Sequence, residues 1–132
     1  AALYLAGVSG IGYGLRKVLG RFAEKGIAIS TIVASGGAAQ SPLSCQMLAD
    51  STGITVALPD APEPVLLGAA MLGAVACGVH GDANGAMSAM SGSAQVFRPA
   101  TGDFARLHSA RFAAFTALQG AARDLRASLR GN

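Results

Sequence analysis

The sequence is poor in the residues on which several large classes of site depend. Among its 132 residues it has no tryptophan, two cysteines and two histidines, and only 13% of its residues are charged. Cys45 and Cys77 form no CxxC pair, so we expect two small buried thiols rather than a disulfide or a metal site. His80 and His108 are isolated in the sequence, which is typical of structural or surface histidines, and neither is assigned a catalytic role.

Long hydrophobic runs are also lacking. The longest covers residues 65–79, which is shorter than the ~18 residues of a membrane-spanning helix, and it is interrupted by Gly68, Gly73 and Gly78. We therefore expect a buried core helix and no membrane partner. The chain begins at Ala1 without a Met or a basic leader, which predicts a cytoplasmic protein and a piece of a longer polypeptide.

Positive charge is only slightly in excess, with a formal net charge of +3. Near the C-terminus Arg123, Arg126 and Arg130 fall on the side of a predicted helix opposite its apolar residues, so we interpret them as a solvated face. A nucleic-acid site would carry a denser basic patch with interleaved aromatic residues. We expect no nucleic-acid partner, and salt-sensitive binding to nucleic acid would indicate the contrary.

The residues that are abundant point to a closely packed α/β domain. Hydrophobic residues make up 52% of the chain, and there are 18 glycines. Apolar periodicity and capping residues predict two buried strands alternating with helices, an α/β layer. Because two strands make a thin sheet, we expect more of the sheet to lie in sequence outside these residues. The predicted strands are 29–35 and 54–58, and the predicted helices are 3–25, 41–52, 63–78, 82–91 and 103–129.

The most informative segment, residues 31–42, reads as a strand, a glycine pair and a capped helix. Gly36 and Gly37 let a ligand approach the backbone closely. Ser41 can cap the following helix, and Pro42 suits its first turn. The free N–H groups and partial positive charge of a helix N-terminus suit a phosphate, although the pattern alone is more often that of a tight turn.

Two better-known phosphate motifs are absent. No Gly-Lys-Ser/Thr follows the glycine pair, so the segment is not a Walker A loop. Gly10, Gly12 and Gly14 lie within a helical pattern instead of following a strand, so they are not a dinucleotide-binding fingerprint.

Four stretches together resemble the C-terminal lobe of the FGGY carbohydrate kinases. They are Ser-Gly-Gly-Ala-Ala-Gln-Ser-Pro-Leu at 35–43, Gln-Met-Leu-Ala-Asp at 46–50, Thr52-Gly53, and the segment 62–73 that contains Leu-Gly-Ala-Ala. Tyr-Gly-Leu-Arg at 13–16 and the stretch 86–99 are similar to the pentulose kinase (ribulokinase-like) branch of that family. The resemblance covers nearly all of the chain.

The resemblance implies a fold and an activity. The fold would be α/β, an actin-like ATPase (ribonuclease H-like) lobe, of which residues 1–132 form the C-terminal nucleotide-binding part with long flanking helices. The full-length enzyme would transfer the gamma-phosphate of ATP to a sugar hydroxyl, with Mg2+ as cofactor. Its substrate would be a pentulose such as ribulose, bound through an N-terminal lobe outside this chain.

The resemblance also implies the nucleotide-binding residues. Gly36 and Gly37 would meet the phosphate or ribose, and Ser41 would lie near the adenine with Ala38 and Gln40 beside it. The sequence departs from the family pattern at three of these positions: Ala38 replaces a frequent third glycine, and Gln40 and Ser41 stand at common Lys or Asn-type positions. The helix around residues 68–70 would be a hinge-side segment.

Two further residues fit the family pattern with an open role. Gln46 and Asp50 belong to the 46–50 stretch, and they are equally consistent with a family site and with helix-surface or packing positions.

The chemistry of phosphoryl transfer is not complete in this chain. The family's Asp-x-Gly-Thr phosphate loop and catalytic aspartate would lie upstream, so we expect no catalytic residue, no metal ligand set and no kinase activity from these residues alone. The alternative is a non-catalytic nucleotide-binding or assembly module. An exposed apolar face would allow homo-oligomers. None of the seven acidic residues lies in a matching motif: Glu24, Asp50, Asp60, Glu63, Asp82, Asp103 and Asp124.

Overall fold

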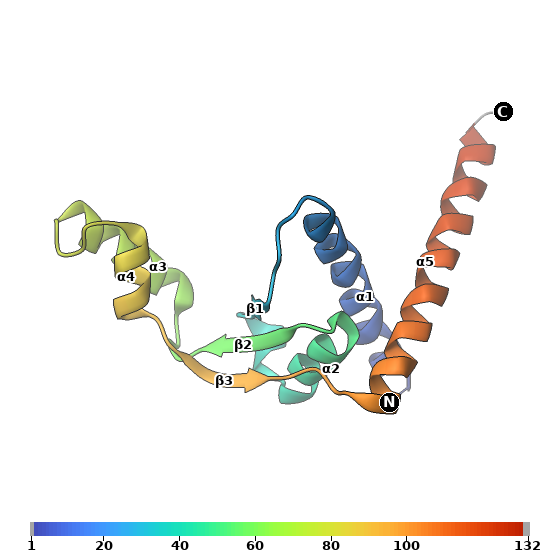
Figure 1. Ribbon diagram of the computed structural model, residues 1–132, viewed down its shortest axis with the longest axis horizontal. Coiled ribbons are helices and arrows are strands. Elements are labelled where there is room, and N and C mark those ends of the chain that lie inside the picture. Colours follow the sequence, from blue (N-terminus) through green and yellow to red (C-terminus); the bar gives the residue numbers. More distant parts are fainter. Residues whose placement is uncertain (1, 131–132) are drawn as a thin grey trace.

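The computed structural model describes residues 2–130 and has α/β architecture (Figure 1). It confirms the α/β class, the five predicted helices, and the long helices at the two ends of the chain. The elements in chain order are α1 (Ala2–Glu24), β1 (Thr31–Val33), the short 3-10 helix η1 (Gly37–Gln40), α2 (Pro42–Thr52), β2 (Thr55–Pro59), α3 (Pro64–Ala76), α4 (Ala83–Met90), β3 (Ser93–Phe97) and α5 (Gly102–Arg130).

The strands form one small mixed sheet in the order β1-β2-β3. β1 runs parallel to β2 with Thr31 beside Thr55, and β3 runs antiparallel to β2 with Phe97 beside Val56. The prediction of two strands is therefore wrong, since β3 is a third. Its sequence, Ser-Ala-Gln-Val-Phe, neither alternates nor forms an apolar run, so only the pairing with β2 makes it a strand.

The core is small and lies between α2 and the sheet. Its buried cluster is Cys45, Ala49, Val56 and Phe97, and Ile32 packs against it. β2 is buried as predicted. The prediction of a buried β1 is wrong for the structure of residues 2–130, in which most of this strand is exposed to solvent. The α2–sheet contact fixes the position of the turn that precedes α2.

Helix α2 begins and ends where its sequence predicts. The Ser41 Oγ accepts a hydrogen bond from the Ser44 N–H at 3.3 Å, and Pro42 occupies the first turn. At the other end Gly53 adopts φ 74°, and its N–H donates to the Ala49 carbonyl.

Helices α1 and α5 pack against α2. Gly12 of α1 lies so close to Ser51 that a Cβ at this position would be 1.8 Å from the serine Oγ. The first half of α5 crosses α1 and α2, and its C-terminal half extends away from them (Figure 1). No helix within residues 2–130 is long and apolar enough to cross a membrane.

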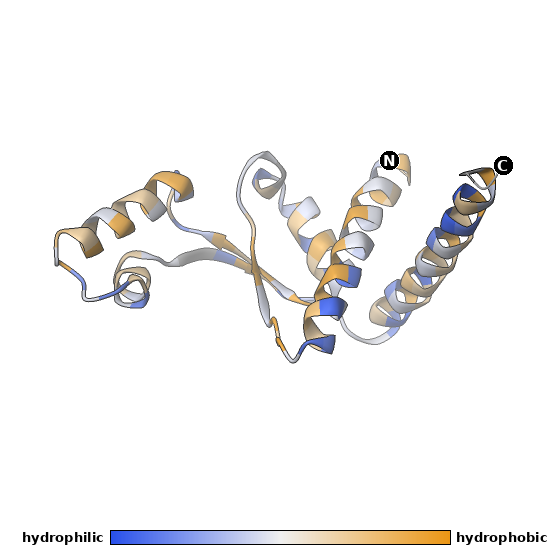
Figure 2. Ribbon diagram, turned by 90° about the horizontal axis from the view of Figure 1, so that it is seen from above, coloured by the Kyte–Doolittle hydropathy of each residue, from blue (hydrophilic) through white to orange (hydrophobic). Residues whose placement is uncertain are grey.

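Helices α3 and α4 form an arm at the far end of the β2–β3 ribbon (Figures 1 and 2). α3 is apolar around its circumference, but among its residues only Met71 is buried, and Leu72 is 66% exposed. The prediction of a buried core helix is therefore wrong, because α3 packs against α4 instead of the main core. Cys77, which follows α3, is exposed, so only Cys45 fits the prediction of buried thiols.

Candidate functional site

The glycine pair forms a tight turn between β1 and α2. Gly36 has φ 84°, a conformation that other residues rarely adopt, and its carbonyl accepts a hydrogen bond from the Ala39 N–H at 3.1 Å. Gly37 starts η1 with an ordinary φ. A Cβ added at either glycine would meet nothing within 4 Å. Gly36 is therefore required by the backbone, whereas Gly37 faces open space.

One hollow lies between this turn and the segment that leads from β2 to α3. We call it the turn cleft; its volume is about 420 Å³, and it is lined on one side by residues 34–37, 39 and 40 and on the other by residues 58, 59 and 61–65. Within the described part of the chain, no hydrogen bond uses the N–H groups of Ser35, Gly36 or Gly37. The turn thus presents backbone donors beside a cleft of ligand size.

A second hollow lies on the other side of the turn. We call it the apolar groove; its volume is about 630 Å³, and it is bounded by Tyr4, Val8 and Ile11 of α1, by β1, and by the start of α2. Apolar walls of this kind suit a flat ring, and the backbone donors of the turn lie at its rim. Residues 34, 35, 37 and 39 line both hollows, so the turn forms the ridge between them.

The structure brings the predicted nucleotide-binding residues together, but they do not face one hollow. Gly36, Gly37 and Gln40 line the turn cleft, while Gly37 and Ser41 line the apolar groove. The Ser41 hydroxyl also accepts the capping hydrogen bond of α2. Ala38 lies in the same 3-10 turn, and its side chain falls outside the part that the structure describes.

Acidic side chains near the turn are sparse. Glu63 is the acidic residue that lines the turn cleft, and within residues 2–130 no group of three His, Cys, Asp or Glu side chains is placed to hold a metal ion. A Mg2+ ion at this site would therefore be held mainly by phosphate oxygens and water, with Glu63 as the nearby carboxylate. This is the way in which Mg2+ commonly binds beside nucleotides.

Gln46 and Asp50 act as a tether between α2 and the segment after β3. The Asp50 carboxylate accepts hydrogen bonds from the Ala100 N–H at 2.8 Å and from the Gln46 amide at 2.9 Å. The Gln46 amide also donates to the Arg98 carbonyl at 2.9 Å. Of the two roles left open by the sequence, the structure shows the packing role. The two bonds that reach Arg98 and Ala100 join residues about 50 positions apart, so no local sequence signal predicted them.

Three other acidic residues also have structural partners. Asp82 caps α4 by accepting from the Gly85 N–H at 2.7 Å. Glu24 and Asp103 pair with arginines one helical turn away. None of these three residues lines the turn cleft.

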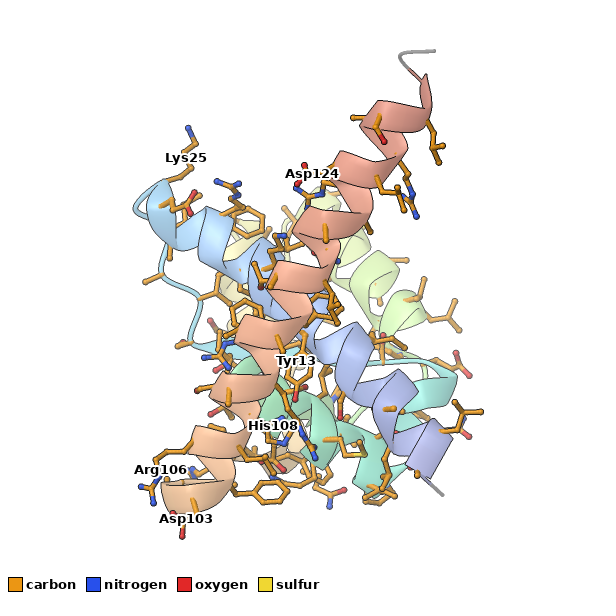
Figure 3. All side chains as sticks on the ribbon, turned by 90° about the vertical axis from the view of Figure 1, so that its right-hand side faces the viewer. Tyr13, Lys25, Asp103, Arg106, His108 and Asp124 are labelled. Atoms are coloured by element: carbon orange, nitrogen blue, oxygen red, sulfur yellow. The ribbon has the colours of Figure 1, made fainter. Side chains whose placement is uncertain are left out.

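A buried polar pair joins α1 to α5. The Tyr13 hydroxyl and the His108 Nδ1 lie 2.9 Å apart, and Figure 3 shows the two side chains meeting where the helices cross. Burial raises the pKa of Tyr13, with smaller opposing effects of Arg111 and Arg16. Burial also lowers the pKa of His108, and Asp50 partly opposes this shift. His108 is thus structural, as expected, but its pairing with Tyr13 was not predicted.

Comparison with known proteins identifies the protein family that this chain resembles. Residues 1–77 match the FGGY family of carbohydrate kinases, C-terminal domain. The chain is 42% identical over 99 residues to a human FGGY carbohydrate kinase domain-containing protein, which is 75% of this chain and 18% of that protein.

Two further relatives are metabolic kinases by name. A ribulokinase of Vibrio parahaemolyticus is 29% identical over 118 residues, 89% of this chain and 21% of the relative. A glycerol kinase of Bordetella parapertussis is 45% identical over 56 residues, 42% of this chain and 11% of the relative. The chain therefore spans about a fifth or less of the length of the curated relatives it matches.

Proposed function

The chain belongs to the FGGY family of carbohydrate kinases and contains the family's C-terminal domain, and on this premise we propose that it forms the ATP-binding part of an enzyme that phosphorylates a sugar hydroxyl. The fold of the complete lobe is the actin-like ATPase fold. The substrate is a pentulose such as ribulose, a choice supported by the likeness to ribulokinases. The enzyme uses Mg2+ with its nucleotide and works in the cytoplasm.

The observation that carries the proposal is the exposed glycine turn at the start of α2. It combines free backbone N–H groups, a capped helix N-terminus and an adjoining cleft of about 420 Å³. The backbone donors of the turn favour phosphate oxygens. Gly36 and Gly37 bind the phosphate or ribose side of the nucleotide.

The two hollows bind different parts of the nucleotide. The apolar groove beside Ser41 receives the adenine, and the turn cleft beside Gln40 receives the more polar part. Because the Ser41 hydroxyl is engaged in capping α2, its contribution to base recognition comes mainly through the groove wall that it helps to form. Ala38 completes the turn through its backbone.

The chemical step belongs to residues outside this chain. Transfer of the gamma-phosphate requires a group that orients or deprotonates the sugar hydroxyl, together with metal-bridged phosphates in line with it. A positioned general base contributes roughly 10²–10⁴ in rate. Four of the acidic residues, Asp50, Asp82, Glu24 and Asp103, have tethering, capping or pairing roles, and we assign to this chain the binding and orientation of the nucleotide and not the transfer itself.

The proposal is tested by isothermal titration of the purified protein with Mg-ADP. We expect the wild type to bind, and we expect Gly37→Asp to lose at least about tenfold in affinity because a carboxylate would face the phosphates. Gly37→Ala is the matched control, since Gly37 has an ordinary φ and a Cβ there meets nothing within 4 Å. It should lose less affinity than Gly37→Asp.

Two results would contradict the site. Equal affinity of wild type and Gly37→Asp would place the nucleotide elsewhere. Absence of binding by a wild-type protein with a cooperative unfolding transition would show that the turn has no nucleotide affinity of its own. Sugar-dependent ADP production by these 132 residues alone would contradict the assignment of the chemistry to other parts of the enzyme.

A further inference from the structure

A third hollow lies at the C-terminal half of α1, away from the glycine turn. We call it the basic cleft; its volume is about 640 Å³, and it is lined by α1, by Ala28 and Ile29 of the following loop, by Thr52 at the end of α2 and Ile54 beyond it, and by Phe112 of α5. It shares no lining residue with the turn cleft or the apolar groove. Its size is within the range of about 300–1,000 Å³ that small ligands occupy.

The cleft has an excess of positive charge. Arg16, Lys17 and Arg21 line it, and the acidic residue among its lining residues is Glu24. Glu24 is paired with Arg21 at 2.8 Å. Within the described residues, no carboxylate lies in ion-pair range of Arg16 or Lys17, so two positive charges remain without an anionic partner.

Both unpaired cations are half-buried and held in place. The Arg16 guanidinium lies over the Phe112 ring, 4.6 Å from its centroid. The Lys17 Nζ donates to the Gln119 Oε1 at 2.9 Å, and this neutral amide leaves its charge uncompensated. The Phe112 ring offsets part of the cost of partly burying the Arg16 charge, while the hydrogen-bond partner of Lys17 is a neutral amide. Neither contact neutralises the positive charge, so an anion entering the cleft would be stabilised by both cations.

The rest of the wall is apolar. Ile29, Ile54 and Phe112 contribute side chains around the basic groups. A guanidinium and an ammonium favour a phosphate or carboxylate group, and the guanidinium can bind it through two parallel hydrogen bonds. Apolar walls favour a ligand with a hydrophobic body.

We propose that the basic cleft is a second ligand site, which binds a small organic anion through Arg16 and Lys17 and packs its apolar body against Phe112 and Ile54. The site is independent of the proposed nucleotide site. It therefore predicts that an organic anion and Mg-ADP bind together.

The test is NMR titration of the isotope-labelled protein with phenyl phosphate, benzoate and inorganic phosphate as probes. We expect phenyl phosphate to cause saturable shifts at Ile54 and Phe112 but not at Gly37. Inorganic phosphate should bind more weakly, because it lacks the apolar body. Benzoate distinguishes a carboxylate from a phosphate preference, and saturable binding of either organic probe in the cleft supports the site.

Charge-matched variants locate the interaction. Arg16→Gln should raise the dissociation constant of the better organic probe by at least about tenfold. Lys25→Gln removes one positive charge from a residue near the end of α1 that does not line the cleft (Figure 3), so it should change the constant by less than about twofold. If Arg16→Gln fails to fold, Lys17→Gln tests the same site from the neighbouring cation.

Several outcomes would overturn the proposal. They are shifts that do not saturate, equal effects of Arg16→Gln and Lys25→Gln, inorganic phosphate binding as tightly as phenyl phosphate, and displacement of the probe by Mg-ADP. Because the lining residues of the two sites do not overlap, Gly37→Asp should leave probe binding unchanged whether or not the nucleotide site is correct.

Discussion

At the residue scale, the buried contact between Tyr13 and His108 makes stability depend on pH. His108 is 4% exposed and Tyr13 is 5% exposed, so water cannot take the place of either side chain in the hydrogen bond between them. The groups that act on the imidazole are Asp50, which raises its pKa, and Arg111 and Arg16, which lower it. Burial has the largest effect, and the folded-state pKa lies below the ordinary value of 6.5.

The sign of the effect follows from proton binding. Below pH 6.5 the unfolded chain takes up a proton on His108 more readily than the folded chain, so the free energy of unfolding falls as the pH drops toward the folded-state pKa. Above pH 6.5 this contribution is fully present. We predict a lower urea midpoint at about pH 5 than at about pH 7.5, with a smaller difference in His108→Asn. An identical pH dependence in the variant would contradict the assignment to His108.

At the element scale, the crossing of α1 over α2 depends on the missing side chain of Gly12. A Cβ there would lie 1.8 Å from the Ser51 Oγ and 2.8 Å from its Cβ, and Ser51 is fully buried. The serine hydroxyl is also bonded to the Met47 carbonyl at 2.6 Å, which limits its freedom to move. We predict that Gly12→Ala lowers the free energy of unfolding by about 1–3 kcal/mol, measured by urea denaturation.

Gly14 of the same helix provides the matched control. A Cβ at Gly14 meets nothing within 4 Å, so Gly14→Ala adds helix propensity without a clash. It should raise the free energy of unfolding by about 0.5–1 kcal/mol. Destabilisation by both variants to the same extent would show that the close crossing of α1 and α2 is not the cause.

Elements with local signals were predictable from the sequence. Ser41-Pro42 and Gly53 mark the two ends of α2 because capping depends on residues within one turn of each helix end. The glycine turn was located for the same reason. β3 was not predictable, because its strand conformation depends on pairing with β2, about 40 residues earlier.

The surroundings of the candidate site were harder to predict than its residues. The resemblance placed Gly36, Gly37, Gln40 and Ser41 in one segment, and the structure shows that this segment separates two hollows. The opposite walls come from α1 and from the β2–α3 segment, whose positions depend on tertiary packing. For the same reason the basic cleft, which combines residues from α1, α2 and α5, was not predictable from the sequence.

At the scale of the whole molecule, the apolar arm formed by α3 and α4 is separated from the main core. Hydropathy colouring shows α3 as an apolar helix at one end of the molecule (Figure 2). The helix has no charged residue, and Val65 and Leu72 are 81% and 66% exposed. The exposed Leu129 of α5, in contrast, stands on a helix with several arginines. An uncharged apolar surface of this kind favours association.

We predict that the purified protein self-associates through α3, as measured by sedimentation equilibrium over a range of concentrations. Leu72→Glu should raise the dissociation constant of the oligomer by at least about tenfold, because a carboxylate would be desolvated in the contact. Leu129→Glu, at a similarly exposed leucine, should raise it by less than about threefold. Both substitutions are at exposed positions, so neither should lower the urea midpoint appreciably. A wild-type protein that stays monomeric, or equal effects of the two variants, would exclude α3 as the associating surface.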